Sequence, residues 1–231
     1  MLTWVTVAGM SIGVLGGTGP AGMAVAARLA SVGYPVVIGS RSADRAEEKA
    51  AEVRAAWPQF TLDLKGGTND EAAACEVIVL ATPWDSAATT AREHEAALHG
   101  KVVISMANAL VRVGHEFQPL VPPRGSVAAH VQVAVPGCHV VAALHHLPAK
   151  ELSHLGEPID SDVLICSDDK AALRVVSDIV EKIPGCRPLD AGELSNATAI
   201  EAFTAVLLQL NIRYKTRVAP ALNGIKGDPR K

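Results

Sequence analysis

Short apolar runs alternate along the chain with longer, alanine-rich segments. The runs are rich in Val, Ile and Leu, and they are too apolar throughout for strands that have one face in water. The longer segments space their apolar residues as helices do and carry their charges on one side. This strand and helix rhythm predicts an α/β fold with a mostly parallel, doubly wound sheet.

The expected elements follow from these runs. The predicted strands are SIGVLG (11–16), PVVIGSR (35–41), FTLDLK (60–65), EVIVLAT (76–82), KVVISM (101–106), CHVVAAL (138–144), DVLICS (162–167) and CRPLD (186–190). The predicted helices lie near residues 21–32, 43–56, 85–98, 169–182 and 195–213. Gly33 suits the position after the first helix, and Ser42 can cap the second, which should end before Pro58. The rhythm weakens between residues 108 and 136, where VPPRG indicates a loop.

The pattern divides the chain into two expected units. Residues 1–191 carry all the predicted strands and form a Rossmann-like domain, and residues 192–231 form a small helical domain. The apolar stretch at 204–212 predicts a buried helix or a dimer seam, and we expect a homodimer. The residues before Met10 precede the first predicted strand, so we hypothesise that they are a dispensable extension and that Met10 is the natural start.

Composition and charge exclude several classes of function. A chain of 231 residues with 49% hydrophobic residues can bury a substantial core. Its net charge of -3 gives no reason to expect nucleic acid or an anionic membrane surface as a partner. The four cysteines stand far apart without a CxxC pair, so we expect buried thiols in a reducing compartment and no metal site. Since the sequence shows no basic leader or apolar membrane span, we expect a cytoplasmic protein.

A glycine-rich turn follows the first predicted strand and opens the first predicted helix. Its pattern is Gly17-x-Gly19-x-x-Gly22. Gly17 permits a tight turn, Gly19 lets the backbone approach a pyrophosphate, and Gly22 lets the helix pack closely on the strand. The helix N-terminus adds N–H donors and positive potential. In this context the turn predicts dinucleotide binding, and a tight turn without a ligand is the alternative.

The end of the second predicted strand distinguishes NAD from NADP. NAD-binding versions of this unit place an Asp or Glu there, about 20 residues past the turn, where it binds the adenosine ribose. This chain has Ser40 and Arg41 instead, followed by Arg45 near the start of the next helix. A hydroxyl and two guanidinium groups suit the 2′-phosphate of NADP. The alternative is that the two arginines pair with acids of that helix, such as Glu47.

Ligands of a doubly wound sheet gather at the carboxyl ends of its strands. Three predicted ends stand out: ATPW (81–84), SMANAL (105–110) and LHHLPAKEL (144–152). Trp84 can lie against a flat ring or can simply pack in the core. His145 and His146 can hydrogen-bond a carbonyl-bearing ring, and on a strand only one of the two would face the site. Lys150 is expected to be a surface charge.

At this point several motifs carry a resemblance. The combination of GVLGGTGPAG, VIGSR, ATPW, ALHHLPA and RPLDAGELSN resembles the F420-dependent NADP reductase family over nearly the whole chain. That family moves a hydride between NADP(H) and the 8-hydroxy-5-deazaflavin coenzyme F420, so the resemblance implies these two cofactors. The chain departs from the archaeal pattern at Thr198 and Ala202, where those members carry Arg and Ser.

The resemblance also implies roles for individual residues. At the NADP pyrophosphate it places Thr18, Gly19, Pro20 and Ala21, between Gly17 and Gly22 of the glycine motif, and at the 2′-phosphate it places Ser40, Arg41 and Arg45. Along the cleft for nicotinamide and deazaflavin it places Trp84, Ala88, Leu110 and Ala149. His145 matches a histidine beside the reacting rings, and Thr204 matches a hydroxyl on the late helix. The helical domain would close this cleft.

The implied chemistry needs few polar groups. The site has to stack two rings with the reacting carbons about 3–3.5 Å apart in a cleft that excludes water, while His145 and Thr204 orient the deazaflavin. Two other functions stay open: an NADP-dependent reductase of a small imine or carbonyl, with His145 as proton donor, and a non-catalytic NADP redox sensor. The direction of transfer also stays open.

The end of the chain is basic. Residues 211–231 contain six basic side chains and one acid, Asp228, which is a local charge of +5 in a chain of net charge -3. Coenzyme F420 has a phosphate and a glutamate-rich tail, so we expect this end to attract it, with Arg213 and Lys226 as the favoured residues.

Overall fold

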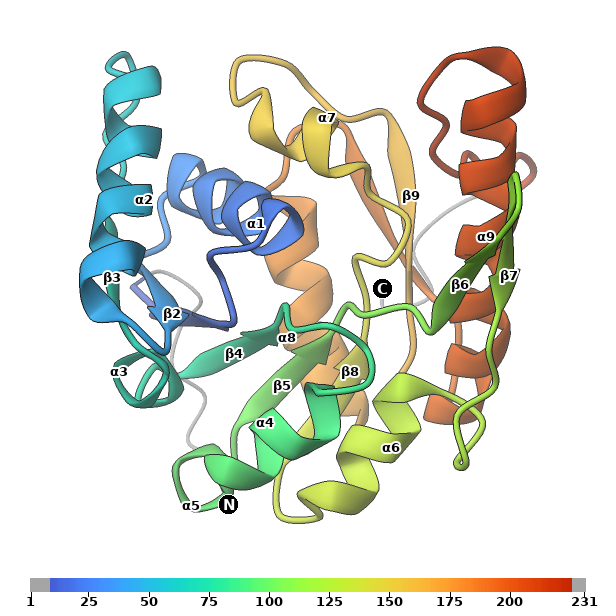
Figure 1. Cartoon of the computed structure of the whole chain (residues 1–231), viewed down its shortest axis with the longest axis horizontal. Helices are drawn as coiled ribbons and strands as arrows, with labels where there is room; N and C mark the ends of the chain where they lie inside the picture. The colour runs from blue at the N-terminus through green and yellow to red at the C-terminus, as the bar shows by residue number, and fades with distance from the viewer. Residues whose placement is uncertain (1–8, 226–231) are drawn as a thin grey trace.

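The computed structural model describes residues 9–225, and its central feature is a six-stranded parallel sheet (Figure 1). The strand order is β3-β2-β1-β4-β5-β8, so the chain starts in the middle of the sheet and winds outward in both directions. This order confirms the predicted doubly wound, Rossmann-like fold. The strands are β1 (Ile12–Leu15), β2 (Val36–Ser40), β3 (Leu64–Thr68), β4 (Val77–Leu80), β5 (Val102–Ser105) and β8 (His139–Ala142).

Helices cover both faces of the sheet, and each face has its own hydrophobic core. Side chains of α1, α2, α7 and α8 fill one core, and those of α3, α4 and α6 fill the other. Since β1 and β4 lie between the two cores, they are buried along their whole length and have continuous apolar sequences. The helices are α1 (Pro20–Ser31), α2 (Ala43–Ala56), α3 (Asn69–Ala73), α4 (Ala87–Glu93), α5 (Glu95–Leu98), α6 (Val127–Ala134), α7 (Ala149–Ser153), α8 (Lys170–Glu181) and α9 (Ala197–Tyr214), the last preceded by a 3-10 turn (Leu194–Asn196).

The local expectations at the first two helices are confirmed. Gly33 follows the end of α1 with φ +91°, which a residue without Cβ adopts freely. The Ser42 hydroxyl caps α2 by accepting a hydrogen bond from the Arg45 N–H at 3.3 Å, and α2 ends at Ala56. The four cysteines are free and buried, as expected.

Two expected elements have different bounds. The third strand was expected at 60–65 but runs from Leu64 to Thr68. It contains Gly66 and Gly67, which pack closely against α2 and α3. A Cβ on Gly66 would overlap the backbone of α2, so this strand lacks the apolar side chains by which a strand is recognised. The helix expected at 85–98 is two helices, broken at His94, whose imidazole Nδ1 lies 3.0 Å from the carboxylate of Asp70.

The last two strands do not extend the main sheet. β9 (Ser161–Ile165) and β10 (Cys186–Asp190) form a separate parallel pair, joined to β8 by one bridge between Ala142 and Cys166. The stretch with a weak rhythm holds structure that we did not predict. It contains α6 and an antiparallel hairpin of β6 (Leu110–Val113) and β7 (Glu116–Pro119), which turns at Gly114 and lies beside α9 (Figure 1).

Some expectations fall on parts of the chain that the structure does not describe. The hypothetical extension before Met10 lies almost wholly outside the described residues, and so does Lys226. Within residues 9–225, no helix combines the length and the apolar character that crossing a bilayer requires.

Candidate active site

The glycine turn joins β1 to α1 and leaves a helix N-terminus open. A Cβ on Gly17 would stand 2.8 Å from the carbonyl oxygen of Val14, and a Cβ on Gly22 would stand 2.8 Å from the Cα of Gly17. These two glycines therefore permit the turn and the close helix packing. A Cβ on Gly19 would meet nothing within 4 Å, and Gly19 gives α1 no side-chain cap. The first N–H groups of α1 thus remain available to an anion.

A cavity of about 950 Å³ lies in front of this turn. Ser40, Arg41 and Arg45 line it together with Thr18, Gly19, Pro20 and Ala21, so the structure brings these predicted residues to one place. Among the described residues, neither arginine forms an ion pair. Asp44, Glu47 and Glu48 were the acids considered as partners, and of these Glu47 instead binds Arg54 at 2.6 Å and the N–H of Gly66. Two free guanidinium groups beside an uncapped helix N-terminus make an anion site.

Further residues line this cavity that sequence reasoning missed. The Asn69 side chain accepts a hydrogen bond from the N–H of Gly16 at 3.3 Å and so supports the turn from α3. Thr82, two residues after the end of β4, has a buried hydroxyl without a hydrogen-bond partner among the described residues. The position of Thr82 at a strand end was the available signal, whereas nothing in the sequence linked Asn69 to the turn.

Trp84 and Ala88 line a second, smaller cavity of about 200 Å³. Its other walls include Pro122 and Pro123, so Trp84 is also partly packed against the core. Thr89 borders both cavities, which makes them neighbours. Leu110 lies at the start of β6, where the hairpin leaves the sheet, opposite Pro119.

The two histidines lie beyond the end of β8, in a turn. Leu144 has φ +67°, and this left-handed residue directs both His145 and His146 to the same cavity, of about 320 Å³. The expectation that adjacent histidines face opposite ways was therefore wrong, because it assumed an extended strand. Ala149 and Thr204 line this cavity too, and Lys150 lies exposed at its edge.

The two rings differ in their surroundings. His146 places its Nε2 2.8 Å from the carbonyl oxygen of Ile200 and packs edge-on against Phe203. His145 is 6% exposed, and neither of its ring nitrogens has a hydrogen-bond partner among the described residues. Burial lowers the pKa of His145 to about 3, with a smaller contribution from His146, so the ring is neutral at physiological pH.

Two side chains of the β5 and α9 segments hold the histidine turn. The Asn108 amide donates to the carbonyl oxygen of His145 at 3.3 Å, and the Thr204 hydroxyl lies 3.0 Å from the Asn108 side-chain oxygen. Sequence reasoning singled out the strand end SMANAL but not Asn108 within it. Glu201, also missed, accepts from the N–H groups of Val127 and Ala128 and so ties α9 to the start of α6.

Glu201 is a buried carboxyl group in an unusual state. It is 4% exposed, and burial raises its pKa to about 7 although its two backbone hydrogen bonds act in the opposite direction. The protonation of this group therefore changes near neutral pH. Its role is in the packing of α9, since both its partners are backbone groups of α6.

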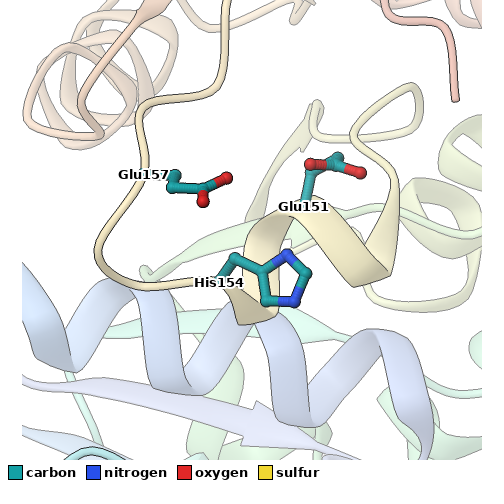
Figure 2. A group of neighbouring side chains, drawn as sticks. All are labelled: Glu151, His154 and Glu157. Carbon is teal, nitrogen blue, oxygen red and sulfur yellow. The ribbon is translucent and has the colours of Figure 1, made fainter.

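Helix α7 and the loop after it bring together Glu151, His154 and Glu157, whose ligand atoms all lie within 4.8 Å of one another (Figure 2). These residue types can bind a divalent cation, but Glu151 already forms an ion pair with Arg217 at 3.1 Å. The loop backbone rests on buried Arg28, whose guanidinium donates to five carbonyl oxygens, those of Glu151, Leu152, His154, Leu155 and Glu157. Arg28 thus has a structural role that its place in a helix did not reveal.

The cavities at the glycine turn and the histidine turn lie near each other. A groove of about 520 Å³ between α1, α2 and α7 has Pro20 of the first cavity and Ala149 of the second among its walls. Buried polar atoms without partners among the described residues occur at the carboxyl ends of β4, β5 and β8, in Thr82, Ser105 and His145. Tyr34, Ser177 and Gln209 have such atoms elsewhere in the fold. Because buried polar groups are normally hydrogen-bonded, the atoms at the strand ends fit ligands with polar rings and ribose hydroxyls.

Comparisons with known proteins agree with this geometry. Residues 11–109 match a family model described as NADP oxidoreductase coenzyme F420-dependent. The chain is 36% identical over 213 residues to the F420-dependent NADP reductase of Methanocaldococcus jannaschii, covering 90% of this chain and 95% of that protein. It is also 36% identical to the Methanothermobacter marburgensis enzyme of the same name, covering 91% and 96%. A solved structure from Arthrobacter, described as a "putative F420 dependent NADP-reductase", is 26% identical with a TM-score of 0.74, and the match covers 92% of this chain and 100% of that chain.

Proposed function

We propose that this chain, which belongs to the family of coenzyme F420-dependent NADP oxidoreductases, works with the glycine turn holding NADP and the histidine turn facing F420. The reaction is the transfer of a hydride between reduced coenzyme F420 and NADP+. One observation carries the assignment of the two turns. Among the described residues, Arg41 and Arg45 of the anion site form no ion pair and the buried His145 ring has no hydrogen-bond partner. The cavities that these residues line are linked by the groove that contains Pro20 and Ala149.

The first half of the site binds NADP. Thr18, Gly19 and Ala21 offer the pyrophosphate an uncapped helix N-terminus, while Pro20 fixes the first turn and Gly17 and Gly22 shape the approach. The 2′-phosphate is bound by the residues of the second strand end, Ser40, Arg41 and Arg45. The absence of a carboxylate at that strand end favours NADP over NAD.

The second half of the site receives the deazaflavin. When bound, reduced F420 supplies a hydride, and the residues of this chain orient it and exclude water. His145 is neutral, so it offers one N–H donor and one acceptor nitrogen to polar groups of the ring, and Thr204 holds the turn behind it. We assign the apolar walls of the ring cleft to Trp84, Ala88, Leu110 and Ala149.

The charge at the edge of the histidine cavity suits an anionic coenzyme. Lys150 and Arg217 border the cavity, and both are exposed. Sequence reasoning favoured Arg213, but Arg213 is not among the residues that line this cavity, whereas Arg217 lines it although it pairs with Glu151 at 3.1 Å. We therefore assign the attraction of the phosphate and glutamate-rich tail to Lys150 and Arg217 first.

We also propose a division into two units, a dimer and a location. Residues 1–191 would bind NADP, and residues 192–231 would close the deazaflavin cleft with α9. Phe203 and Val206 lie one turn apart on α9 and are both exposed, and these apolar side chains support a homodimer. The proposed location is the cytoplasm, in keeping with four free cysteines. Light scattering during gel filtration tests the dimer, and a monomer at micromolar concentration would contradict it.

One experiment tests the function. The purified protein is mixed with NADP+ and reduced F420, and the absorbance of both products is followed. We expect equal amounts of NADPH and oxidised F420. Formation of neither product would refute the assignment. Oxidation of NADPH by a small imine or carbonyl, but not by oxidised F420, would favour the reductase alternative, and NADP binding without any turnover would favour a sensor.

A further inference from the structure

The turn that contains His145 is not stabilised by its own backbone conformation or by the His145 side chain. Leu144 adopts φ +67°, a left-handed conformation that is unfavourable for any residue with a Cβ. The His145 ring forms no hydrogen bond with the described residues, so its own side chain does not anchor the turn. The turn therefore depends on contacts to its backbone and to its neighbours.

Asn108 provides the contact nearest to the reacting ring. Its amide N–H₂ donates to the backbone carbonyl of His145 at 3.3 Å, and its amide oxygen accepts from the Thr204 hydroxyl at 3.0 Å. The Thr204 hydroxyl also lies 3.5 Å from the same His145 carbonyl, but it has only one proton. The shorter distance directs that proton to Asn108, so Thr204 acts on the turn mainly through Asn108.

This contact joins three segments that are distant in the sequence. Asn108 follows β5, His145 follows the neighbouring strand β8, and Thr204 belongs to α9, with separations of 37 residues from Asn108 to His145 and 96 from Asn108 to Thr204. On the other side of the turn, His146 is fixed to Ile200 of the same helix. Loss of Asn108 would leave His146 in place but free the backbone at His145.

We propose that Asn108 is a positioning residue for hydride transfer, which sets the orientation of the His145 ring by holding the His145 carbonyl against Thr204. Asn108 acts through the histidine turn and does not bind NADP. The kinetic consequences rest on the proposed function, whereas the effect on the histidine ring does not.

The test uses the substitutions Asn108→Ala and Asn108→Asp in the full chain. Asp is close to Asn in size and retains an acceptor for Thr204 but lacks the donor to the His145 carbonyl. The matched control is Gln132→Ala, because Gln132 is another amide side chain that binds backbone groups of β8, at the amino end of that strand. Three quantities are measured: steady-state kinetics with reduced F420, NADP affinity, and the ¹⁵N signals of the His145 ring in the ligand-free protein.

We expect both Asn108 variants to lower kcat/KM for reduced F420 about tenfold, in keeping with the loss of one buried hydrogen bond, while NADP affinity stays within twofold. The His145 ring signals should shift or broaden in both variants and stay unchanged in Gln132→Ala. Should Asn108→Ala fail to fold, Thr204→Val is expected to give a smaller loss of the same kind, and Thr204→Ser, which keeps the hydroxyl, should lose less than Thr204→Val.

Two results would overturn the proposal: unchanged His145 signals in Asn108→Asp, or an equal loss of NADP affinity, which would make Asn108 a direct NADP contact. If the wild-type chain does not oxidise reduced F420, the proposed function fails, and the ring signals still decide whether Asn108 positions His145.

Discussion

The two halves of the site are built in different ways. The glycine-turn half comes mainly from one continuous β-α-β stretch, and its geometry is set by where the backbone can pass, at Gly17 and Gly22. The histidine-turn half is assembled by side-chain hydrogen bonds between residues as far apart in sequence as Asn108 and Thr204. A site of the first kind is encoded locally. A site of the second kind depends on the packing of the whole chain, so the two halves should respond differently to substitution, pH and salt.

The largest expected effect is on the first half. The substitution pair Arg41→Ala and Arg45→Ala removes both free guanidinium groups from the cavity at the glycine turn. A charge-assisted hydrogen bond contributes about 1.5–3 kcal/mol, and because both arginines are exposed we take the lower value for each. The loss of two such bonds, about 3 kcal/mol, should lower NADP affinity on the order of 100-fold while NAD affinity changes little. Calorimetric titration with both dinucleotides measures this.

The control for this pair is Arg54→Ala, on the same helix, because Arg54 is engaged with Glu47 and does not line the cavity. An equal loss of NADP and NAD affinity in the double variant would contradict the assignment to the 2′-phosphate. It would show instead that the two arginines act on the pyrophosphate or on the fold of α2.

The same contrast explains what the sequence revealed. The glycine spacing, the Ser42 cap and the strand end at Ser40 are local signals, and all three have the expected place in the structure. Buried strands such as β1 were recognisable because both their faces are apolar. The third strand was misplaced because close helix packing requires glycine where a strand usually has apolar residues, at Gly66.

The second half was predictable only in part. The histidines were found as residues at a strand end, but their common orientation depends on the left-handed Leu144, which nothing in the sequence indicates. Asn108 and Glu201 are polar residues whose partners are backbone groups of other segments. A pattern of apolar spacing carries no information on such long-range hydrogen bonds, and the hairpin at 110–119 escaped notice because it is short and half-exposed.

The next effect concerns pH and is confined to the second half. The pKa of Glu201 is about 7 in the folded protein, against an ordinary value of 4.5 for a glutamate carboxyl. A raised folded-state pKa means that this group's stabilisation is present below pH 4.5 and is lost as the pH rises through 7. A shift of this size corresponds to about 3 kcal/mol in the free energy of unfolding. Urea denaturation between pH 5 and 8 should show this decline, and Glu201→Gln should remove it.

The matched control for the pH experiment is Glu157→Gln, an exposed carboxyl on the loop after α7. Its pH profile should follow that of the wild-type protein. An unchanged slope in Glu201→Gln would mean that the buried carboxylate is stabilised by its two N–H donors to the extent that burial no longer raises its pKa. NADP affinity, which rests on residues of the other half of the site, should not follow the Glu201 profile.

A smaller effect is expected from the central residue of the second half. His145→Ala should lower kcat/KM for reduced F420 by roughly 10- to 100-fold, because the deazaflavin ring would lose a hydrogen-bonding partner that the protein holds in place. NADP affinity should stay nearly intact. Because the pKa of His145 is about 3, kcat should not show a histidine titration between pH 5 and 8. His115→Ala, in the hairpin turn, is the control. A large loss of NADP affinity alone would refute the role of His145.

The smallest expected effect concerns Arg217, whose charge should attract reduced F420 to the histidine cavity without binding it tightly. Arg217 borders the histidine cavity but is exposed and paired with Glu151, so its contribution is screened by salt. Arg217→Ala should raise the KM for reduced F420 about threefold at low ionic strength, and the difference should vanish in strong salt. Arg213→Ala is the control, because Arg213 points to Glu116 of the hairpin, and it should behave as the wild type. A larger effect at Arg213 would move the anion-attracting surface from the mouth of the cavity to the outer end of α9.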